Sequence, residues 1–390
     1  MRLFLSVARG LVAVVLIVLA LPLCVAAIEY LWTPVYDFPA ARPFRGAHWY
    51  NPYAAVTPTA HWLKANFHAH TRAWGGLTNG HQTAAEITNT YRALGYDVIG
   101  ISNYHRIDDT FAAESSYMPS YEYGYSVRKT HRLAIGAQAV NWLDFPLGQT
   151  VHHKQLIIDR LRPTTDLIAI NHPRMRHGHT AADLRRLANY DFVEALNPFG
   201  DSIEEWDAAL SSGHAVWILA DDDNHDVANR EILGIRWTMI ASPSSRRDSV
   251  TVALRAGRHY GVRGHLAELD NGLRSLTVRG DTITVACDTT PTRITFIGEG
   301  GATLAAAAGV ATAGYVARPG DPYVRVEITT PMTTMYLNPV IRWDGVALPH
   351  PRPRLNVTAT WAVRSALLAT YLMLGALAIS VRRRRAQVSS

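Results

Sequence analysis

Cysteine is scarce in this sequence: its 390 residues include only two, Cys24 and Cys287. Cys24 lies inside an apolar run, which excludes a disulfide framework, and two cysteines are too few for a cysteine-based zinc site. Charged residues make up 18 % of the chain and apolar residues 48 %, a balance that excludes a disordered chain and a coiled coil. The sequence therefore encodes folded structure, and its length allows two domains with room for tails.

The body of the chain also lacks an excess of basic charge. The formal net charge of +6 comes from 38 basic and 32 acidic residues. Seven of the basic residues flank the two apolar ends, and they are Arg2, Arg9, Arg364 and Arg382 to Arg385. Without these seven, 31 basic residues face 32 acidic ones. This balance indicates no phosphate-binding face, and we expect no nucleic acid as a partner.

Long uncharged runs occur near both ends. The first, Gly10 to Ile28, has 19 residues and would span about 28 Å as a helix, close to the thickness of a bilayer core. The second, Ser365 to Val381, has 17 residues and precedes four arginines. We predict a transmembrane anchor over residues 1–32, a transmembrane helix over 361–381 and a basic cytoplasmic tail over 382–390.

The arginines outside these runs predict that both ends of the chain are cytoplasmic. The bulk of the chain would then lie on the extracytoplasmic side of the cell membrane. Val25-Ala26-Ala27 also permits cleavage of the first run as a signal peptide, and that alternative leaves the predicted location unchanged.

Between the two ends, the residue pattern changes twice. Residues 33–60 are rich in proline, tyrosine and tryptophan and are predicted to be a linker. Residues 61–264 alternate strand-like and helix-like segments, which predicts a parallel sheet or barrel. Residues 265–353 contain short β-type runs separated by turn signals, which predicts a small β-sandwich domain.

Histidines are concentrated in the alternating region, and many follow a predicted strand. Fourteen of the 17 histidines lie between His48 and His225. His68 and His70 follow "LKANF", and Asp223 and His225 follow "AVWILA". Side chains alternate between the two faces of an extended segment, so residues two positions apart lie on the same face. The other polar residues that follow predicted strands are Asn103, His105, Gln138, Asn141, His172 and Asn197.

The carboxyl ends of parallel barrel strands converge on one face, where active sites are built. We therefore expect these residues, although far apart in the sequence, to lie close together. Neutral imidazoles with a carboxylate are ligands suited to zinc, manganese or iron. The pattern predicts a divalent metal site; the alternative is that the histidines are ordinary surface residues.

Four segments, in this order, resemble motifs of the polymerase and histidinol phosphatase (PHP) superfamily. They are "NFHAHT" (66–71), "GYDVIGISNYH" (95–105), "AINHP" (169–173) and "LADDDNHD" (219–226), and "SVTVALRAGRHYGVRG" (249–264) is similar to the helix that follows in many members. The resemblance covers about half of the chain, residues 62–264. It implies a distorted (β/α)7 barrel, a cluster of two or three divalent metals and hydrolysis of phosphoesters.

By position, the resemblance implies a set of metal ligands and several substituted positions. The ligands would be His68, His70, His172, Asp223 and His225, with His105 as a substitute in the second motif and His153, or else His152, as a further histidine. Asn66 replaces the usual aspartate, Asn103 lies in place of another, and the bridging glutamate falls at Gln138. A neutral amide cannot offset the repulsion between two cations, so we expect one or two metal ions. Glu194 is expected to orient a ligand histidine or to make a buried hydrogen bond.

The mechanism expected from this chemistry is attack of a metal-bound hydroxide on phosphorus, because a bound cation lowers the pKa of its water from about 15.7 toward 7. Residues that follow the ligands would complete the site. Lys154, Arg174 and Arg176 are candidates for holding phosphoryl oxygens. His177, His179 and His81 are candidates for protonating the leaving group.

The sequence thus predicts a membrane-anchored, metal-dependent phosphoesterase. Its substrate would be a phosphorylated small molecule, a lipid-linked compound or a glycan, since the anchors hold the site near the bilayer. The rival prediction is a non-catalytic barrel that binds a cell-surface glycan or a partner protein, because the amide substitutions would remove catalysis. Another metal-dependent hydrolysis, such as deacylation, is a third interpretation.

Overall fold

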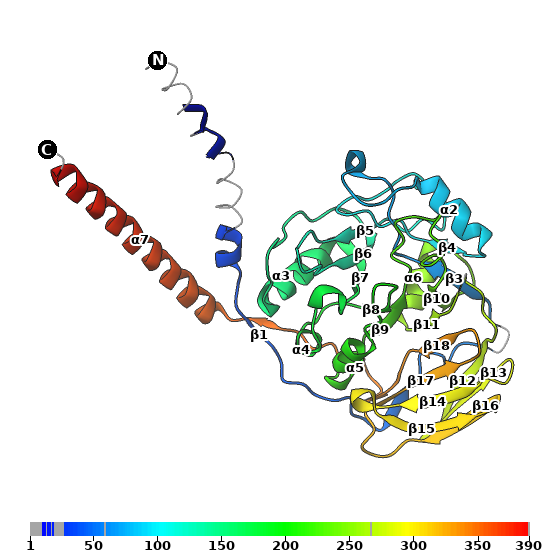
Figure 1. The fold of residues 1–390 in the computed structure, drawn as a ribbon. Coiled ribbons are helices and arrows are strands. Elements are labelled where there is room, and N and C mark those ends of the chain that lie inside the picture. Colours follow the sequence, from blue (N-terminus) through cyan, green and yellow to red (C-terminus); the bar gives the residue numbers. More distant parts are fainter. Residues whose placement is uncertain are drawn as a thin grey trace. The chain divides into compact units, whose positions relative to one another are not determined.

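The structure is a computed structural model that describes residues 10–12, 14–16, 18, 27–57, 60–265 and 267–388. The chain divides into two compact units (Figure 1). One unit combines Met1–Phe38 with Pro353–Ser390, and the other is Pro39–Arg352. The candidate site lies entirely in the larger unit.

A five-stranded sheet forms one half of the larger unit. Its strands, in spatial order, are β5 (Ser120–Tyr123), β6 (Arg132–Ala137), β7 (Thr165–Ile170), β8 (Phe192–Leu196) and β9 (Trp217–Ala220). β7, β8 and β9 are parallel, whereas β6 is antiparallel to both of its neighbours. Nearly all residues of these strands are buried, as expected for a sheet covered on both faces.

A ten-stranded sheet forms the other half and runs through both of the domains that the sequence predicts. Its main path is β15 (Thr303–Ala308), β14 (Arg293–Ile297), β17 (Tyr323–Thr329), β18 (Thr334–Leu337), β11 (His259–Arg263), β10 (Arg236–Ala241), β3 (Trp62–Asn66) and β4 (Val98–Ile99). β2 (His48–Tyr50) and β19 (Val340–Trp343) pair off this path. Because β11 pairs with β18, the predicted boundary between residues 264 and 265 falls within one continuous sheet.

A third sheet, of three strands, packs against the end of the ten-stranded sheet that lies beyond β11. It consists of β12 (Leu273–Arg279), β13 (Thr282–Cys287) and β16 (Thr312–Val316). Ile283 and Val285 from this sheet share one buried cluster with Phe296 and Val326 from the large sheet. The sandwich-like packing expected for residues 265–353 is therefore present, with one of its two layers continued from the preceding region.

In place of the predicted distorted (β/α)7 barrel, the five-stranded and ten-stranded sheets of the described residues are joined by few hydrogen bonds. An isolated bridge between Tyr104 and Glu122 links the segment after β4 to β5. At β9, the other edge of the five-stranded sheet, the hydroxyl of Thr238 on β10 accepts a hydrogen bond from the N–H of Ala220 and donates one to its carbonyl. His259 Nε2 lies 2.8 Å from the carbonyl of Ile218, also on β9. Side chains thus take the place of a backbone ladder there.

Short helices connect the strands (Figure 1). They are α2 (Ala84–Ala93), α3 (Val151–Leu161), α4 (Ala181–Leu184), α5 (Ile203–Ser211) and α6 (Arg247–Arg255). A capping box begins α2: Glu86 accepts from the N–H of Thr83, and the Thr83 hydroxyl accepts from the N–H of Glu86. Gly95 follows with a positive φ of 79°, which glycine adopts without strain and which ends the helix.

The smaller unit contains a two-stranded pairing and one long helix. β1 (Tyr36–Asp37) pairs with β20 (Arg354–Leu355), and α7 (Val357–Val388) follows. Within α7, Val357–Val381 spans 25 residues with a mean hydropathy of 1.7. In the part of the chain that the structure describes, it is the one helix long and apolar enough to cross a membrane, and it contains the predicted helix 361–381. The other predicted span, residues 10–28, lies largely outside the described residues.

Candidate metal centre

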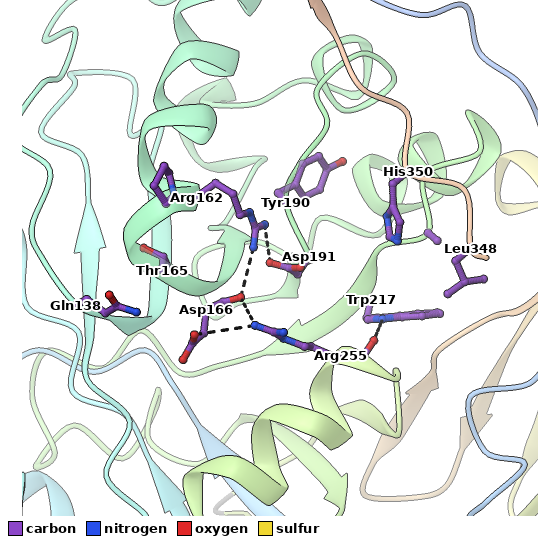
Figure 2. Close-up of a pocket in the computed structure, with 12 residues that line it drawn as sticks. Gln138, Arg162, Thr165, Asp166, Tyr190, Asp191, Trp217, Arg255, Leu348 and His350 are labelled. Atoms are coloured by element: carbon purple, nitrogen blue, oxygen red, sulfur yellow. Dashed lines mark hydrogen bonds and ion pairs between the residues drawn. The ribbon is translucent and has the colours of Figure 1, made fainter. Parts of the chain in front are cut away.

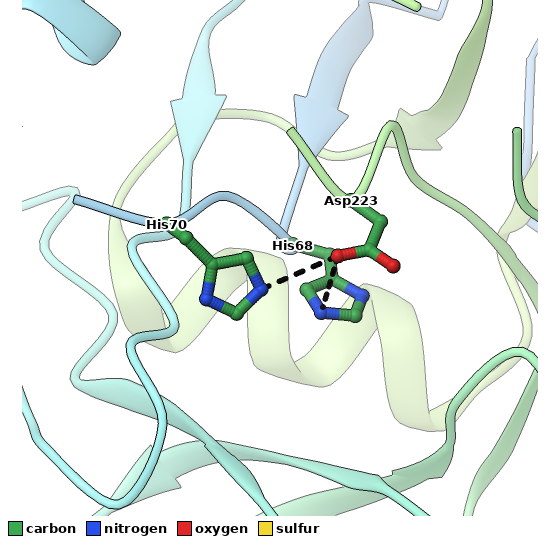
Figure 3. A group of neighbouring side chains, drawn as sticks. All are labelled: His68, His70 and Asp223. Carbon is green, nitrogen blue, oxygen red and sulfur yellow. Dashed lines mark ion pairs between the residues drawn. The ribbon is translucent and has the colours of Figure 1, made fainter. Parts of the chain in front are cut away.

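The segment that follows β3 places two imidazoles on one face. The N–H of His70 donates to the carbonyl of Asn224, so this segment stays extended beside the loop after β9. His68 and His70 are both buried, and their Nε2 atoms lie 3.2 and 3.3 Å from the same atom, Oδ1 of Asp223 (Figure 3). The expected period-2 geometry therefore directs both rings at one carboxylate.

A second buried carboxylate, Glu122 on β5, lies among four imidazoles. Its Oε1 is 3.3 Å from His68 Nε2, 3.1 Å from His172 Nε2 and 2.7 Å from His131 Nδ1. Its Oε2 is 3.5 Å from His70 Nε2. Glu122 thus lies between the histidines from β3 and the histidines at the adjoining ends of β6 and β7.

Two groups of these residues have the geometry of metal ligands. The first is His68, His70 and Asp223, and the second is His68, Glu122 and His172. Within each group, one ligand atom from every residue lies within 4.8 Å of the others. The two groups share His68, so the arrangement is a single continuous centre. His225 adjoins it, with its ring stacked on that of His70 at 4.3 Å.

The polar atoms of this centre are buried and lack hydrogen-bond partners. They include Nε2 of His68, His70 and His225, Oε2 of Glu122 and Oδ1 of Asp223. Leaving buried polar atoms unpaired costs free energy, and such atoms in native proteins are normally satisfied by a partner or an ion. A divalent cation would satisfy these nitrogen and oxygen donors together, and their types suit zinc, manganese or iron. The residues present therefore fit a metal centre.

Burial and neighbouring charges set the protonation of the centre. Burial, with repulsion from His225, lowers the pKa of His70 to about 4, so that this ring is neutral near pH 7 and able to bind a cation. Burial acts in the same direction on His68, but Asp223, Glu194 and Glu122 outweigh it and raise the pKa of His68 well above its usual value. Burial raises the pKa of Glu122, but the neighbouring His131 and His68 lower it more strongly. The pKa of Glu122 is therefore well below its usual range.

Glu194 on β8 holds two ligands in position. Its Oε1 lies 2.8 Å from His68 Nδ1, and its Oε2 accepts a hydrogen bond of 2.8 Å from the N–H of His172. A carboxylate on the far ring nitrogen sets the tautomer of a histidine and directs its other nitrogen at the metal. This contact leaves Nε2 of His68 facing the two carboxylates of the centre.

The substituted amides support the backbone of the ligand segments. Asn66 Oδ1 accepts from the N–H of Asp222 at 2.8 Å, which ties the end of β3 to the loop that carries Asp223. Asn103 Oδ1 accepts from the N–H of Thr71 at 2.7 Å. The loop backbone is also strained at two ligands, since His172 has a φ of 27° and Asp223 a φ of 46°. Positive φ angles in residues other than glycine cluster at functional sites.

Glu122 and His131 are absent from the predicted ligands, because a parallel orientation of the strand "RLAIG" would place its other end at the site. β6 is antiparallel, so its first end, preceded by His131, lies next to the carboxyl end of β7. Gln138 follows the other end of β6 and lines a cavity of about 530 Å³ at the amino ends of β7 and β9, together with Thr165 and Trp217 (Figure 2). The assignment of the bridging position to Gln138 is therefore wrong. An acidic residue inside the strand-like run "SYEY" was the available signal for Glu122.

The structure places His105 and His153 outside the group of ligand atoms. His105 accepts a hydrogen bond from the N–H of Gly124 at Nε2, and its Nδ1 lies 3.0 Å from the carbonyl of Asn141. Both of its ring nitrogens therefore have backbone partners. His153 lies on α3, where its Nδ1 forms a capping box with Thr150. These two predicted ligands stabilise a loop and a helix start instead.

The predicted phosphate-binding residues have other partners. Arg174 lies 2.9 Å from Glu204 and 3.5 Å from Glu205, and Lys154 is buried in an ion pair of 2.7 Å with Asp183. Arg176 donates to the carbonyl of Val127.

The predicted proton donors differ in their surroundings. His177 is exposed, His179 is fully buried, and His81 lies 3.9 Å from Asp226. In the described part of the chain, no side-chain hydrogen bond or ion pair joins these candidates, or the three basic residues, to the ligand histidines or carboxylates; the backbone N–H of His81 donates to the carbonyl of His225. Their catalytic roles stay predictions.

No family model matches the sequence, and no curated protein matches it. Among solved structures, the chain is similar to a two-domain protein from Bacteroides vulgatus that is described as containing a predicted PHP-like metal-dependent phosphoesterase. The two sequences are 12 % identical, the alignment covers 82 % of this chain and 99 % of the other, and the TM-score is 0.41.

Proposed function

We propose that this protein is a metal-dependent hydrolase of phosphoesters. The observation that carries the proposal is the convergence of His68, His70, His172, Glu122 and Asp223, whose ligand atoms are buried and close enough to share cations. The choice of phosphoesters rests on the ordered motifs between residues 66 and 226, which resemble those of the PHP superfamily.

A divalent cation bound at this centre supplies a Lewis acid and lowers the pKa of coordinated water. The residues of the chain hold the cation and orient its ligands. Glu194 directs the ring of His68 and fixes the backbone of His172. The neutral ring of His70 is ready to bind without first losing a proton. Because the ligands are buried, charges in the centre interact more strongly than they would in water.

The carboxylate of Glu122 bears on the rival prediction of a non-catalytic barrel. That prediction depended on the amide substitutions, one of which was an amide at the bridging position, where it could not offset the charge of two cations. Glu122 belongs to the second ligand group, and its Oε2 also lies 3.5 Å from Nε2 of His70, which belongs to the first group alone. A carboxylate therefore reaches both ligand groups, and this supports the catalytic proposal over the rival at the bridging position.

We also propose that α7 anchors the protein in the cell membrane, with the larger unit on the extracytoplasmic side. The apolar stretch Val357–Val381 and the four arginines that follow it support this location. Lipid-linked or glycan phosphoesters are then the nearest substrates. A reporter fused after Ser390 is expected to be active only in the cytoplasm, and activity in the outer compartment would contradict the proposed topology.

The activity is tested on the full-length protein purified in detergent. We expect at least one equivalent of zinc, manganese or iron per chain and turnover of an aryl phosphate. His70→Ala and Asp223→Ala should abolish both. His61→Ala is the matched control, because His61 is an exposed histidine outside the ligand groups, and it should keep both. Full metal occupancy without hydrolysis of any phosphoester would overturn the proposal and favour the binding protein.

A further inference from the structure

The positively charged side chain of Lys129 lies near the metal centre. The ammonium of Lys129 is 5.4 Å from the centre of the Tyr104 ring. That ring stacks on His70, with ring centroids 4.7 Å apart, and meets the ring of His131 edge-on at 5.5 Å. One aromatic ring therefore separates the Lys129 ammonium from a metal-ligand candidate.

The backbone around Lys129 is built to hold it there. Lys129 has a φ of 56°, a conformation that costs free energy in a residue other than glycine. The turn is closed by hydrogen bonds from the N–H of Lys129 to the carbonyl of Ser126 and from the N–H of Thr130 to the Ser126 hydroxyl. Gly178 packs so tightly on this turn that a Cβ there would lie 2.5 Å from the carbonyl oxygen of Lys129. The loop after His172 thus fixes the turn.

Within the described residues, the ammonium of Lys129 has no carboxylate within 4.0 Å, whereas Lys154 and Arg174 are both paired. An unpaired, half-buried cation beside a metal centre is placed to receive an anion.

Exposed aromatic rings lie next to Tyr104. Tyr104 is half-buried, and its carbonyl accepts a hydrogen bond of 2.8 Å from Trp74 Nε1. Trp74 is 41 % exposed and packs edge-on against Trp142, which is 58 % exposed. Tyr104, which contacts Lys129, therefore links the buried His70 ring to a pair of exposed rings.

We propose that Lys129 binds the phosphoryl group of the substrate and makes this site select phosphate monoesters over diesters. The proposal rests on the proposed function and names its substrate class. A monoester carries a charge near −2 at pH 7, because its second pKa is about 6, while a diester carries −1. A fixed ammonium therefore stabilises the bound monoester more than the bound diester.

Binding of inorganic phosphate tests the first half of the proposal without requiring catalysis. Calorimetry is carried out on the full-length protein in detergent with Mn²⁺. Lys129→Met should weaken phosphate binding about 10- to 100-fold, since a hydrogen bond to a charged group is lost. Arg128→Met removes the same charge from the exposed neighbouring residue and should weaken it less than about fivefold. Equal effects of the two variants would overturn the assignment of Lys129.

Two further measurements separate a binding role from a structural one. Lys129→Arg should restore most of the phosphate affinity, and Mn²⁺ affinity should stay unchanged in Lys129→Met. For substrate class, the ratio of kcat/KM for phenyl phosphate to that for methyl phenyl phosphate should fall about tenfold in Lys129→Met. An equal loss for both esters would overturn monoester selection. If the parent protein turns over neither ester, the proposed function fails, while the calorimetry still decides whether Lys129 binds phosphate.

Discussion

Replacing Glu122 by glutamine is the sharpest test of the metal centre. The change keeps the size of the side chain and removes its charge. In the structure, Glu122 lies within 3.5 Å of four imidazoles, and its Oε2 has no hydrogen-bond partner. It is fully buried, so solvent screens its charge little. A carboxylate in this position would offset the positive charge of a divalent cation held by these residues.

The expected loss follows from the cost of breaking a buried charge interaction. Removing one partner of a buried ion pair costs about 3 to 5 kcal/mol, which corresponds to a factor of more than about 100 in affinity. We therefore expect Glu122→Gln to weaken Mn²⁺ or Zn²⁺ binding by at least that factor. Titration against a competing chelator measures the dissociation constants directly on the full-length protein.

A matched pair of variants distinguishes the structural assignment from the one made on the sequence. Gln138→Ala changes the position first assigned to the bridging residue, which lines a cavity at the opposite ends of the strands. It should leave metal affinity unchanged. Glu122→Gln protein that binds the metal as tightly as the parent would refute the reasoning, provided that circular dichroism shows the variant to be folded.

Three further variants follow from the same structure. Glu194→Gln removes the carboxylate behind two ligand histidines and should weaken metal binding about 10- to 100-fold, as the chelator titration can measure. Burial lowers the pKa of His259 to about 3, so its contribution to stability is present above pH 6.5 and is lost as the pH falls below that value, by on the order of 1.4 kcal/mol for each pH unit. The free energy of unfolding, measured with urea, should differ less between pH 7 and pH 5 in His259→Gln than in the parent protein. Arg325→Met leaves Asp207 buried without its two 2.7 Å bonds and should cost about 3 to 5 kcal/mol of unfolding free energy, and an unchanged urea midpoint would contradict this.

Local geometry explains which parts of the site could be predicted from the sequence. His68 and His70 are two apart in an extended segment, so their rings share a face whatever the rest of the fold does. Asp223 follows a buried parallel strand, and such strands end at a common edge of the sheet. The capping box of Thr83 and Glu86 likewise depends only on neighbouring residues. Each of these features is decided within a few residues of backbone.

The remaining ligands depend on how strands pair. The direction of β6 is set by its hydrogen bonds to β5 and β7, and its residue pattern is compatible with either direction. Reversing it exchanges Gln138 for His131 at the site. Glu122 looks unremarkable as one acidic residue between two tyrosines, and it becomes a candidate ligand only when β5 lies beside the ends of β3 and β7.

By itself, the sequence of this protein determined the paired imidazoles, the carboxylate after "AVWILA" and an apolar C-terminal stretch that forms a helix, because these depend on local periodicity and composition. Only the tertiary structure decided that Glu122 and His131 join the centre, that Lys129 adjoins it without an acidic partner and that one sheet runs through both predicted domains. The physical reason is that strand direction, register and burial are set by contacts between residues far apart in the chain.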